Sequence, residues 1–317
     1  MIISASRRTD IPAFYSNWFV NRLREGFFLT PNPRNHKSVG KLSCSPQAID
    51  CIVFWSKNPA PMADAFALID NLGYKYYLQF SLTPYGRDIE TNLPDKETLI
   101  ATFRRIGEKI GAERLVWRYD PIIVSGRFPP ERHIEAFRRL AGTLSGCTQK
   151  CVISFIDFYA KINKNIKEFN FNQTTLSVMR SVVRELSLIA KENGLRLFVC
   201  SEAEDFSSCG VSPASCIDGE IIEKLTGRPL KAPKDPGQRP LCNCLASVDI
   251  GMYDSCVHGC VYCYANINQA AALKNAARHD PAAPLLFGAP HPGAAIKEKT
   301  PENMADSPPK DRRLTMV

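Results

Sequence analysis

The alternation of short apolar runs with longer helical segments restricts this chain to a small group of folds. Runs rich in Val, Ile, Phe and Tyr lie at residues 1–5, 51–55, 76–81, 115–119, 151–155 and 196–200. Between them, apolar residues recur at helical spacing over residues 15–25, 62–71, 96–110, 131–144 and 175–193. Repeated βα units of this kind are typical of a parallel sheet covered by helices. No G-x-G-x-x-G sequence follows the first run, so we predict a (β/α) barrel rather than a doubly wound sheet.

The chain of 317 residues is long enough for one such barrel with a tail. We predict a single α/β barrel domain over residues 1–290 and a disordered tail over residues 291–317. The domain ends in a cysteine-rich segment, residues 200–266. That segment contains an irregular, proline-rich connection (205–240) with a short helix near 219–225. A seventh strand (248–253), a cysteine loop (254–264) and a helix (266–278) are expected to follow.

The composition favours a cytoplasmic protein that binds metal. No window approaches the roughly 18 apolar residues of a membrane span, and the first residues do not resemble a secretory signal. In a reducing compartment the twelve cysteines are expected to bind metal or to remain free thiols rather than to pair as disulfides. The net charge of +8 is spread along the whole chain, so a nucleic-acid partner is considered but not favoured.

The cysteine loop carries the most specific signal. Cys256, Cys260 and Cys263 form a C-x3-C-x2-C pattern, and three thiolates in eight residues can hold three corners of one [4Fe–4S] cluster. A tetrahedral zinc site needs four ligands and usually draws them from two separated pairs. The fourth iron, left without a protein ligand, could bind S-adenosylmethionine and pass it an electron, which would give a deoxyadenosyl radical. The alternative is a zinc site made with Cys242, Cys244 or His258.

The loop resembles that of the radical S-adenosylmethionine (radical SAM) superfamily, including the aromatic Tyr262 before the last cysteine. The whole chain is similar to the bacterial DUF1848 family, on its S-R-R-T-D, K-D-P-G-Q-R-P-L-C-N-C and D-I-G-x-Y-x-S-C-x-H-G-C-x-Y-C-Y-A-N sequences. In radical SAM enzymes the loop follows the first barrel strand, whereas here it is C-terminal. The resemblance therefore implies a TIM-like partial barrel, circularly permuted so that the βα unit with the cysteine loop comes last.

The resemblance also implies positions for S-adenosylmethionine. Tyr262 would lie near the adenine, and Tyr264 and Asn266 would line the cofactor pocket. The permutation places Ser6, Thr9 and Asp10 near the amino group of the cofactor. It places Ser81 or Thr83 near the ribose, and Arg118 or Lys57 could pair with the carboxylate.

Polar residues at the ends of the predicted strands or just after them supply the candidate catalytic groups. They are Arg8, Asp10, Arg118 and Asp157. Because the C-terminal strand ends form the active-site face of a parallel barrel, we expect these side chains to share one cavity with the loop sulfurs.

A second group of cysteines requires its own account. Cys200, Cys216, Cys242 and Cys244 would supply four thiolates for an auxiliary [4Fe–4S] cluster or a structural zinc ion, with Cys209 as a competing ligand. The alternative is that they are small buried apolar residues. Cys44, Cys51, Cys147 and Cys151 are assigned to that role.

Three functions remain open on the sequence. The first is a radical SAM enzyme that acts on an unknown substrate and receives electrons from a reductant such as flavodoxin or ferredoxin. The second is a special case of the first, a DNA-repair enzyme resembling spore photoproduct lyase and DNA photolyase in its task. The third is a non-catalytic binding protein stabilised by zinc or an iron–sulfur cluster.

Overall fold

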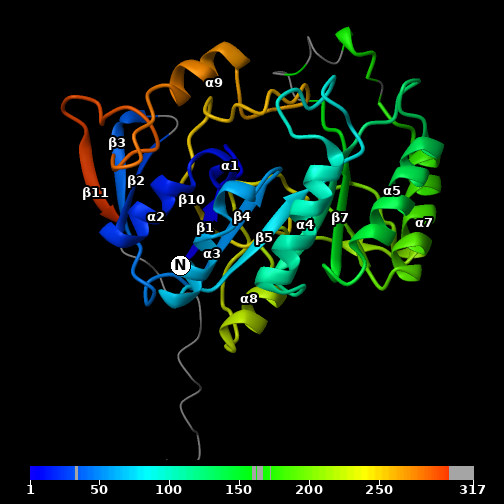
Figure 1. Ribbon diagram of the computed structural model, residues 1–317, viewed down its shortest axis with the longest axis horizontal. Helices are drawn as coiled ribbons and strands as arrows, with labels where there is room; N and C mark the ends of the chain where they lie inside the picture. The colour runs from blue at the N-terminus through cyan, green and yellow to red at the C-terminus, as the bar shows by residue number, and fades with distance from the viewer. Residues whose placement is uncertain (33–34, 159–161, 163–166, 172, 300–317) are drawn as a thin grey trace, which may run out of the picture.

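The largest element of the computed structural model is an eight-stranded parallel sheet in the order β10-β1-β4-β5-β6-β7-β8-β9 (Figure 1). The structure describes residues 1–32, 35–158, 162, 167–171 and 173–299. The strands are β1 (Ile2–Ala5), β4 (Cys51–Ser56), β5 (Tyr76–Ser81), β6 (Leu115–Ile122), β7 (Lys150–Phe155), β8 (Arg196–Val199), β9 (Ser212–Pro213) and β10 (Val248–Asp249). A parallel sheet flanked by helices confirms the predicted α/β class and is consistent with a partial (β/α) barrel.

Helices connect successive strands of this sheet. They are α1 (Ile11–Phe14), α2 (Ser16–Glu25), α3 (Ala65–Asn71), α4 (Lys96–Ile110), α5 (Pro130–Leu144), α7 (Leu176–Glu192), α8 (Gly219–Thr226) and α9 (Gln269–Ala276). Two short 3-10 turns lie in the connections: η1 (Ala60–Met62) between β4 and α3, and η3 (Ser207–Cys209) between β8 and β9. Local signals set the ends. For α4, the Asp95 side chain accepts from the Thr98 N–H at 2.8 Å, and the helix stops at Gly111. The predicted helices are present, most of them within two residues of the predicted bounds.

The central strands β1, β4, β5, β6 and β7 are buried on both faces, and the two faces contribute to different cores. Residues such as Ile3 and Phe54 pack with the connecting helices in the larger core. Their neighbours Ile2 and Val53 point the other way, into a smaller core filled by α8 and by the segment that carries four cysteines. The interior of the partial barrel is therefore closed by residues after β9, and the C-terminal strand ends remain available for a cavity.

A second, three-stranded sheet in the order β11-β3-β2 was not predicted. Its strands are β2 (Phe27–Asn32), β3 (Asn35–Ser43) and β11 (Ala295–Lys299), and it lies at the opposite end of the molecule from α5 and α7 (Figure 1). The disordered tail predicted over residues 291–317 is wrong for 295–299, because the backbone there pairs with β3 in parallel. The remainder of that prediction, residues 300–317, lies outside the described residues.

The seventh predicted strand is shorter than expected. Only Val248 and Asp249 pair with β1. A Cβ on Gly251 would lie 2.2 Å from the Ser6 hydroxyl oxygen, so only glycine lets the cysteine segment approach the end of β1 this closely. Within the described ranges, no helix is long and apolar enough to cross a membrane.

Candidate functional site

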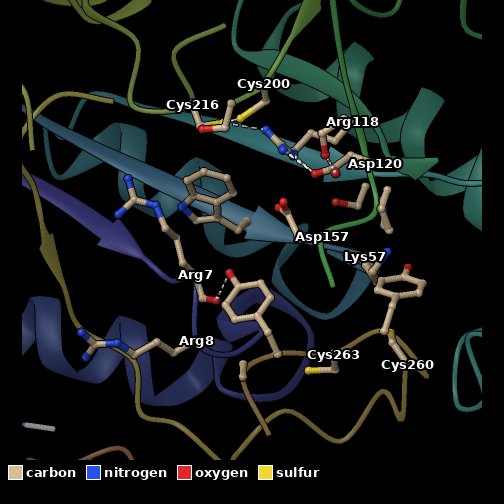
Figure 2. Close-up of a pocket in the computed structure, with 18 of the residues that line it drawn as sticks. Arg7, Arg8, Lys57, Arg118, Asp120, Asp157, Cys200, Cys216, Cys260 and Cys263 are labelled. Atoms are coloured by element: carbon tan, nitrogen blue, oxygen red, sulfur yellow. Dashed lines mark hydrogen bonds and ion pairs between the residues drawn. The ribbon is translucent and has the colours of Figure 1, made fainter. Parts of the chain in front are cut away.

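A cavity of about 360 Å³ lies at the C-terminal ends of the parallel strands (Figure 2). The ends of β1, β4, β5, β6, β7 and β8 each contribute lining residues, as do the cysteine loop and residues 238–244. The predicted site residues that line it are Ser6, Arg8, Thr9, Asp10, Lys57, Ser81, Arg118, Asp157, Tyr262, Tyr264 and the cysteines 200, 216, 242, 244, 256, 260 and 263. The fold thus brings together side chains that are more than 250 positions apart in sequence.

Asp10 holds the cysteine loop against the end of β1. Its Oδ1 accepts from the Ala13 N–H at 2.9 Å and so caps α1. Its Oδ2 lies 2.7 Å from both the Lys57 N–H and His258 Nε2. With both carboxylate oxygens engaged in this way, Asp10 positions the loop, and its catalytic role stays a prediction.

The connection between β5 and α4 holds the loop from the other side. The Asn92 N–H donates to the His258 carbonyl at 2.9 Å, and the Val261 N–H donates to the Ile89 carbonyl at 2.9 Å. The Asn92 side chain adds a bond to the Val257 carbonyl at 2.8 Å. Gly259, with a φ of +70°, makes the left-handed turn that exposes these carbonyls. Hydrogen bonds to the backbone therefore hold the loop in place without any contribution from its sulfurs.

Glu90 is the centre of this second set of contacts, and the sequence analysis missed it. Its carboxylate pairs with Lys57 at 2.9 Å and Lys96 at 2.6 Å, and it accepts from the hydroxyls of Thr83 and Tyr262. Burial opposes ionisation, but the two lysines and the hydrogen bonds lower the pKa of Glu90 to about 2. Glu90 lies in a polar loop, so its local sequence does not indicate that it is buried. The residues that pair with its carboxylate come from other parts of the chain.

The loop thiols are partly buried, and their surroundings shift their pKa values. Burial raises the pKa of Cys256 to about 12 and raises that of Cys260 well above the ordinary thiol value. Lys57, whose ammonium lies 5.3 Å from the centre of the Tyr262 ring, opposes this rise at Cys260. The charges of Cys256 and Cys263 also raise the pKa of Cys260, so the three sulfurs lie in one electrostatic environment.

The opposite wall of the cavity is built around Arg118 (Figure 2). The guanidinium pairs with Asp120, donates to the Gln79 side-chain oxygen at 2.9 Å, and lies 2.8 Å from the Cys216 sulfur. Burial opposes ionisation of Asp120, but Arg118 and the Ser154 hydroxyl hold the pKa of that carboxyl below its usual value. Because Arg118 already has an acid partner, it is a less available cation for a cofactor carboxylate than the sequence suggested.

Trp55 separates Arg118 from a second arginine. The guanidinium carbons of Arg7 and Arg118 each lie 5.4 Å from the centre of the Trp55 ring. Across the cavity mouth, Asp157 pairs with Arg239 from the connection before β10. Neither Trp55 nor Arg239 was predicted as a site residue.

Three further predicted residues are engaged elsewhere. Thr83 and Asn266 are not among the residues that line the cavity. Thr83 donates to Glu90, and the Asn266 side-chain amide donates to the Cys256 carbonyl at 2.6 Å. Ser6 lines the cavity, but its hydroxyl donates to Asp249 at 2.6 Å. Asp249, at the end of β10, also accepts from the backbone N–H groups of Arg7 and Gly251, so it joins the two segments that meet there.

Several buried polar atoms around the cavity have no hydrogen-bond partner in the described part of the chain. They are Arg7 Nη2, Thr9 Oγ1, Ser201 Oγ and His258 Nδ1. Each of the four residues lines the cavity. Buried donors and acceptors are usually satisfied, so these atoms indicate where a polar ligand would be bound.

The metal predictions are not decided by this geometry. Among the described residues, no three His, Cys, Asp or Glu side chains are placed so that they could hold a single metal ion as they stand. Cys209 does not line the cavity, and its sulfur lies 3.9 Å from the Arg180 carbonyl oxygen. Cys44, Cys51 and Cys151 are buried as predicted, and Cys147 is partly buried.

Comparison with known proteins gives a family. A family model described as "Domain of unknown function (DUF1848)" matches residues 2–265. The chain belongs to the DUF1848 family. No curated protein matches it.

Three solved structures to which this DUF1848 protein is similar have TM-scores of 0.30 or below. L-hydantoinase from Arthrobacter aurescens matches with a TM-score of 0.28 and 15% identity, over 57% of this chain and 39% of the hydantoinase. The chain thus spans well under half of that enzyme. A structure of the pneumococcal virulence factor StrH matches with a TM-score of 0.30 and 10% identity, over 78% and 68% of the two chains. A structure of the GH20 modules of pneumococcal exo-β-D-N-acetylglucosaminidase StrH has a TM-score of 0.27 and 12% identity, over 75% and 65%.

Proposed function

We propose that this protein is a radical SAM enzyme whose [4Fe–4S] cluster is held by Cys256, Cys260 and Cys263. The observation that carries the proposal is the position of the loop. All three cysteines line the cavity at the C-terminal strand ends, on a loop fixed from two sides by Asp10 and by the β5–α4 connection. A rigid loop with three sulfurs at the active-site face of a partial barrel is the arrangement that this chemistry requires.

The residues present fit such a cluster. The loop offers three thiols in eight residues, and Nε2 of the nearby His258 is already bound to Asp10. The buried cation of Lys57 beside Cys260 favours the thiolate form that iron binds. With three protein ligands, one iron would remain open to S-adenosylmethionine.

Held by Cys256, Cys260 and Cys263, such a cluster would supply the one-electron reduction that cleaves S-adenosylmethionine. The chain itself would bind and orient the cofactor. Thr9 Oγ1, Arg7 Nη2 and Ser201 Oγ are buried in the cavity wall and have no partner in the described part of the chain. These atoms are placed to hydrogen-bond the polar groups of a bound cofactor or substrate. Tyr262, Tyr264 and Ser81 line the same cavity and would contact the adenosine.

The order of the strands supports the proposed circular permutation. β10, which precedes the cysteine loop, pairs in parallel with β1 through Ile3 and Ser4. The last βα unit of the chain therefore lies next to the first. A circular permutation changes the order of the strands along the chain but not their order in the sheet, so β10 and β1 must be adjacent in a permuted barrel.

The cavity does not single out nucleic acid as the substrate. Three of its cations are paired with acids: Arg118 with Asp120, Arg239 with Asp157, and Lys57 with Glu90. These pairs balance part of the positive charge at the site. We propose an organic substrate of unspecified class and a flavodoxin or ferredoxin as electron donor.

The test is metal content after anaerobic purification. The wild-type protein should contain about four irons and four sulfides bound by the loop and absorb as a brown iron–sulfur protein. Cys260→Ala should lose that iron, because a cluster with two protein ligands is readily lost. Cys209→Ser, which changes a cysteine that does not line the cavity, should keep it. An iron content that is the same in Cys260→Ala and wild type would refute the assignment.

A further inference from the structure

A second group of cysteines lies on the side of the cavity away from the loop. Cys200 directly follows β8, Cys216 follows β9, and Cys242 and Cys244 lie on the connection that leads to β10. All four are at least nine-tenths buried, and all four line the cavity. Figure 2 shows Cys200 and Cys216 beside Arg118, across the cavity from Cys260 and Cys263. The two groups of sulfurs are therefore separate sites.

The four sulfurs contact one another in series. Cys200 Sγ lies 3.3 Å from Cys216 Sγ. Cys216 is also in hydrogen-bond contact with Cys244, and Cys244 with Cys242. The four thiols come from three separate segments of the chain. Their local sequence therefore does not bring them together, and the fold must place each segment at the same point. Intracellular cysteines that are merely small apolar residues have no reason to gather in this way.

Donors surround these sulfurs. Arg118 Nη1 lies 2.8 Å from Cys216 Sγ, the Ile217 N–H donates to Cys244 Sγ at 3.4 Å, and the Arg7 side chain contacts Cys244. N–H groups and guanidinium cations that point at sulfur stabilise the thiolate form, which is the form that binds metal. An apolar thiol cluster would not need two arginines.

We propose that Cys200, Cys216, Cys242 and Cys244 bind one zinc ion, at a site distinct from the cluster loop. The proposal does not rest on the radical SAM function, because none of these residues belongs to that loop.

The spacing of the sulfurs favours a single ion over a second iron–sulfur cluster. Two thiolates on one tetrahedral zinc, with Zn–S bonds of about 2.3 Å, lie about 3.8 Å apart. The observed 3.3 Å between Cys200 and Cys216 is near that value. In a cubane each thiolate binds its own iron, so the width of the cluster separates the sulfurs much further. To close around one ion, the series of contacts must become a tetrahedron by rotation of side chains, since no three described His, Cys, Asp or Glu side chains hold that geometry already.

The site would fasten the long connection between β8 and β10 to the sheet. Backbone bonds already fold this connection around the cysteines: the Leu245 N–H donates to the Ile217 carbonyl, and the Asp235 N–H donates to the Cys244 carbonyl. The same connection carries Gln238 and Arg239 into the cavity wall. A zinc ion with four cysteine ligands has no open position, so its role would be to fix this wall and not to react.

The experiment measures zinc and iron in a variant of the whole chain whose loop can no longer bind a cluster. Cys256, Cys260 and Cys263 are replaced together by Ala, and the protein is purified anaerobically from cells supplied with both metals. The expected result is about one zinc per chain and no iron. About four irons left per chain would identify an auxiliary cluster, and neither metal would leave the four cysteines without a metal; either result overturns the proposal.

A second variant gives the reciprocal test. Cys242→Ser with Cys244→Ser, in a chain with an intact loop, should lose zinc and keep the iron of the loop, whereas Cys147→Ser should change neither metal. If the double variant does not fold, metal-free protein with Cys256, Cys260 and Cys263 replaced by Ala can be titrated with Co²⁺ instead. Intense thiolate-to-cobalt charge-transfer bands that Zn²⁺ abolishes would support a four-sulfur site, and their absence would refute it. A Cys200–Cys216 disulfide, found by mass spectrometry after anaerobic alkylation, would also contradict the proposal. Failure of the loop to bind iron would leave this result unaffected.

Discussion

His258 Nε2 and Asp10 Oδ2 lie 2.7 Å apart, and this contact joins two residues that are 248 positions apart in the chain. Both side chains are buried, with exposed fractions of 3% and 6%. Asp10 belongs to the first βα unit and His258 to the cysteine loop. The contact therefore ties the loop to the end of β1, where S-adenosylmethionine would bind under the proposed function.

Asp10→Asn should destabilise the protein because the amide replaces one acceptor oxygen with a donor. Asn caps a helix as well as Asp, so the loss reflects the contacts with His258 and Lys57. We expect the free energy of unfolding to fall by about 1 to 3 kcal/mol, measured by urea denaturation. Asp95→Asn, at the exposed cap of α4, is the matched control and should leave stability unchanged. Equal stability of the two variants would contradict the role given to Asp10.

Glu90→Gln should be more costly. The change leaves Lys57 and Lys96 without their buried acid partner, and removing one member of a buried ion pair typically costs about 3 to 5 kcal/mol. Thermal and urea unfolding would measure the loss. Glu97→Gln breaks the exposed pair with Arg139 and serves as the control. If Glu90→Gln unfolds like wild type, Glu90 does not organise the loop.

His133 predicts a pH dependence of stability that is independent of the metal sites. Burial lowers the pKa of His133 in the folded state, and its ring nitrogens lie 3.0 Å from the Tyr119 hydroxyl and the Ile123 carbonyl oxygen. The rings of Tyr85 and Phe128 also pack against it, and the charge of Arg132 adds to the lowering.

The unfolded chain therefore binds a proton at His133 more readily than the folded protein. The contribution of neutral His133 to the free energy of unfolding should be fully present well above the unfolded pKa of 6.5. It should be lost as the pH falls below 6.5 toward the lower folded pKa. His133→Gln should flatten this part of the profile, measured by urea unfolding between about pH 7.5 and 5.5. His291→Gln, at an exposed position, should keep the wild-type slope. An unchanged slope in His133→Gln would show that other groups cause the dependence.

The strands β1, β4, β5, β6 and β7 could be predicted from the sequence because each is a continuous apolar run buried on both faces, whereas β9, with two exposed residues, was missed. β5 and α4 have the predicted bounds, and Ile2 and Ile3 show why no alternation was visible, since each faces a core. The β2–β3 hairpin was missed because it contains Pro31 and mixes polar and apolar residues. β11 was missed because its five residues are exposed and include three charges, so only pairing with β3 orders them.

The sequence predicted the site residues that belong to rare types in a recognisable pattern, such as the cysteines. It did not predict the site residues that belong to common types, such as acids in polar loops. Cysteines at ligand spacing mark the loop, and strand ends mark Arg8, Arg118 and Asp157. Glu90 and Asp249 are ordinary acids in their local sequence. Their roles depend on partners such as Lys57, 33 positions away, and Ser6, 243 positions away. Burial of a charge is a property of the fold, which a local pattern does not contain.

The most direct test of the central claim is reductive cleavage of S-adenosylmethionine. Anaerobically reconstituted protein, mixed with dithionite and S-adenosylmethionine, should release 5′-deoxyadenosine and methionine in equal amounts. The variant with Cys256, Cys260 and Cys263 all replaced by Ala should release neither. Wild-type protein that carries about four irons per chain on the loop, yet forms no 5′-deoxyadenosine above the level of the triple variant, would contradict the account.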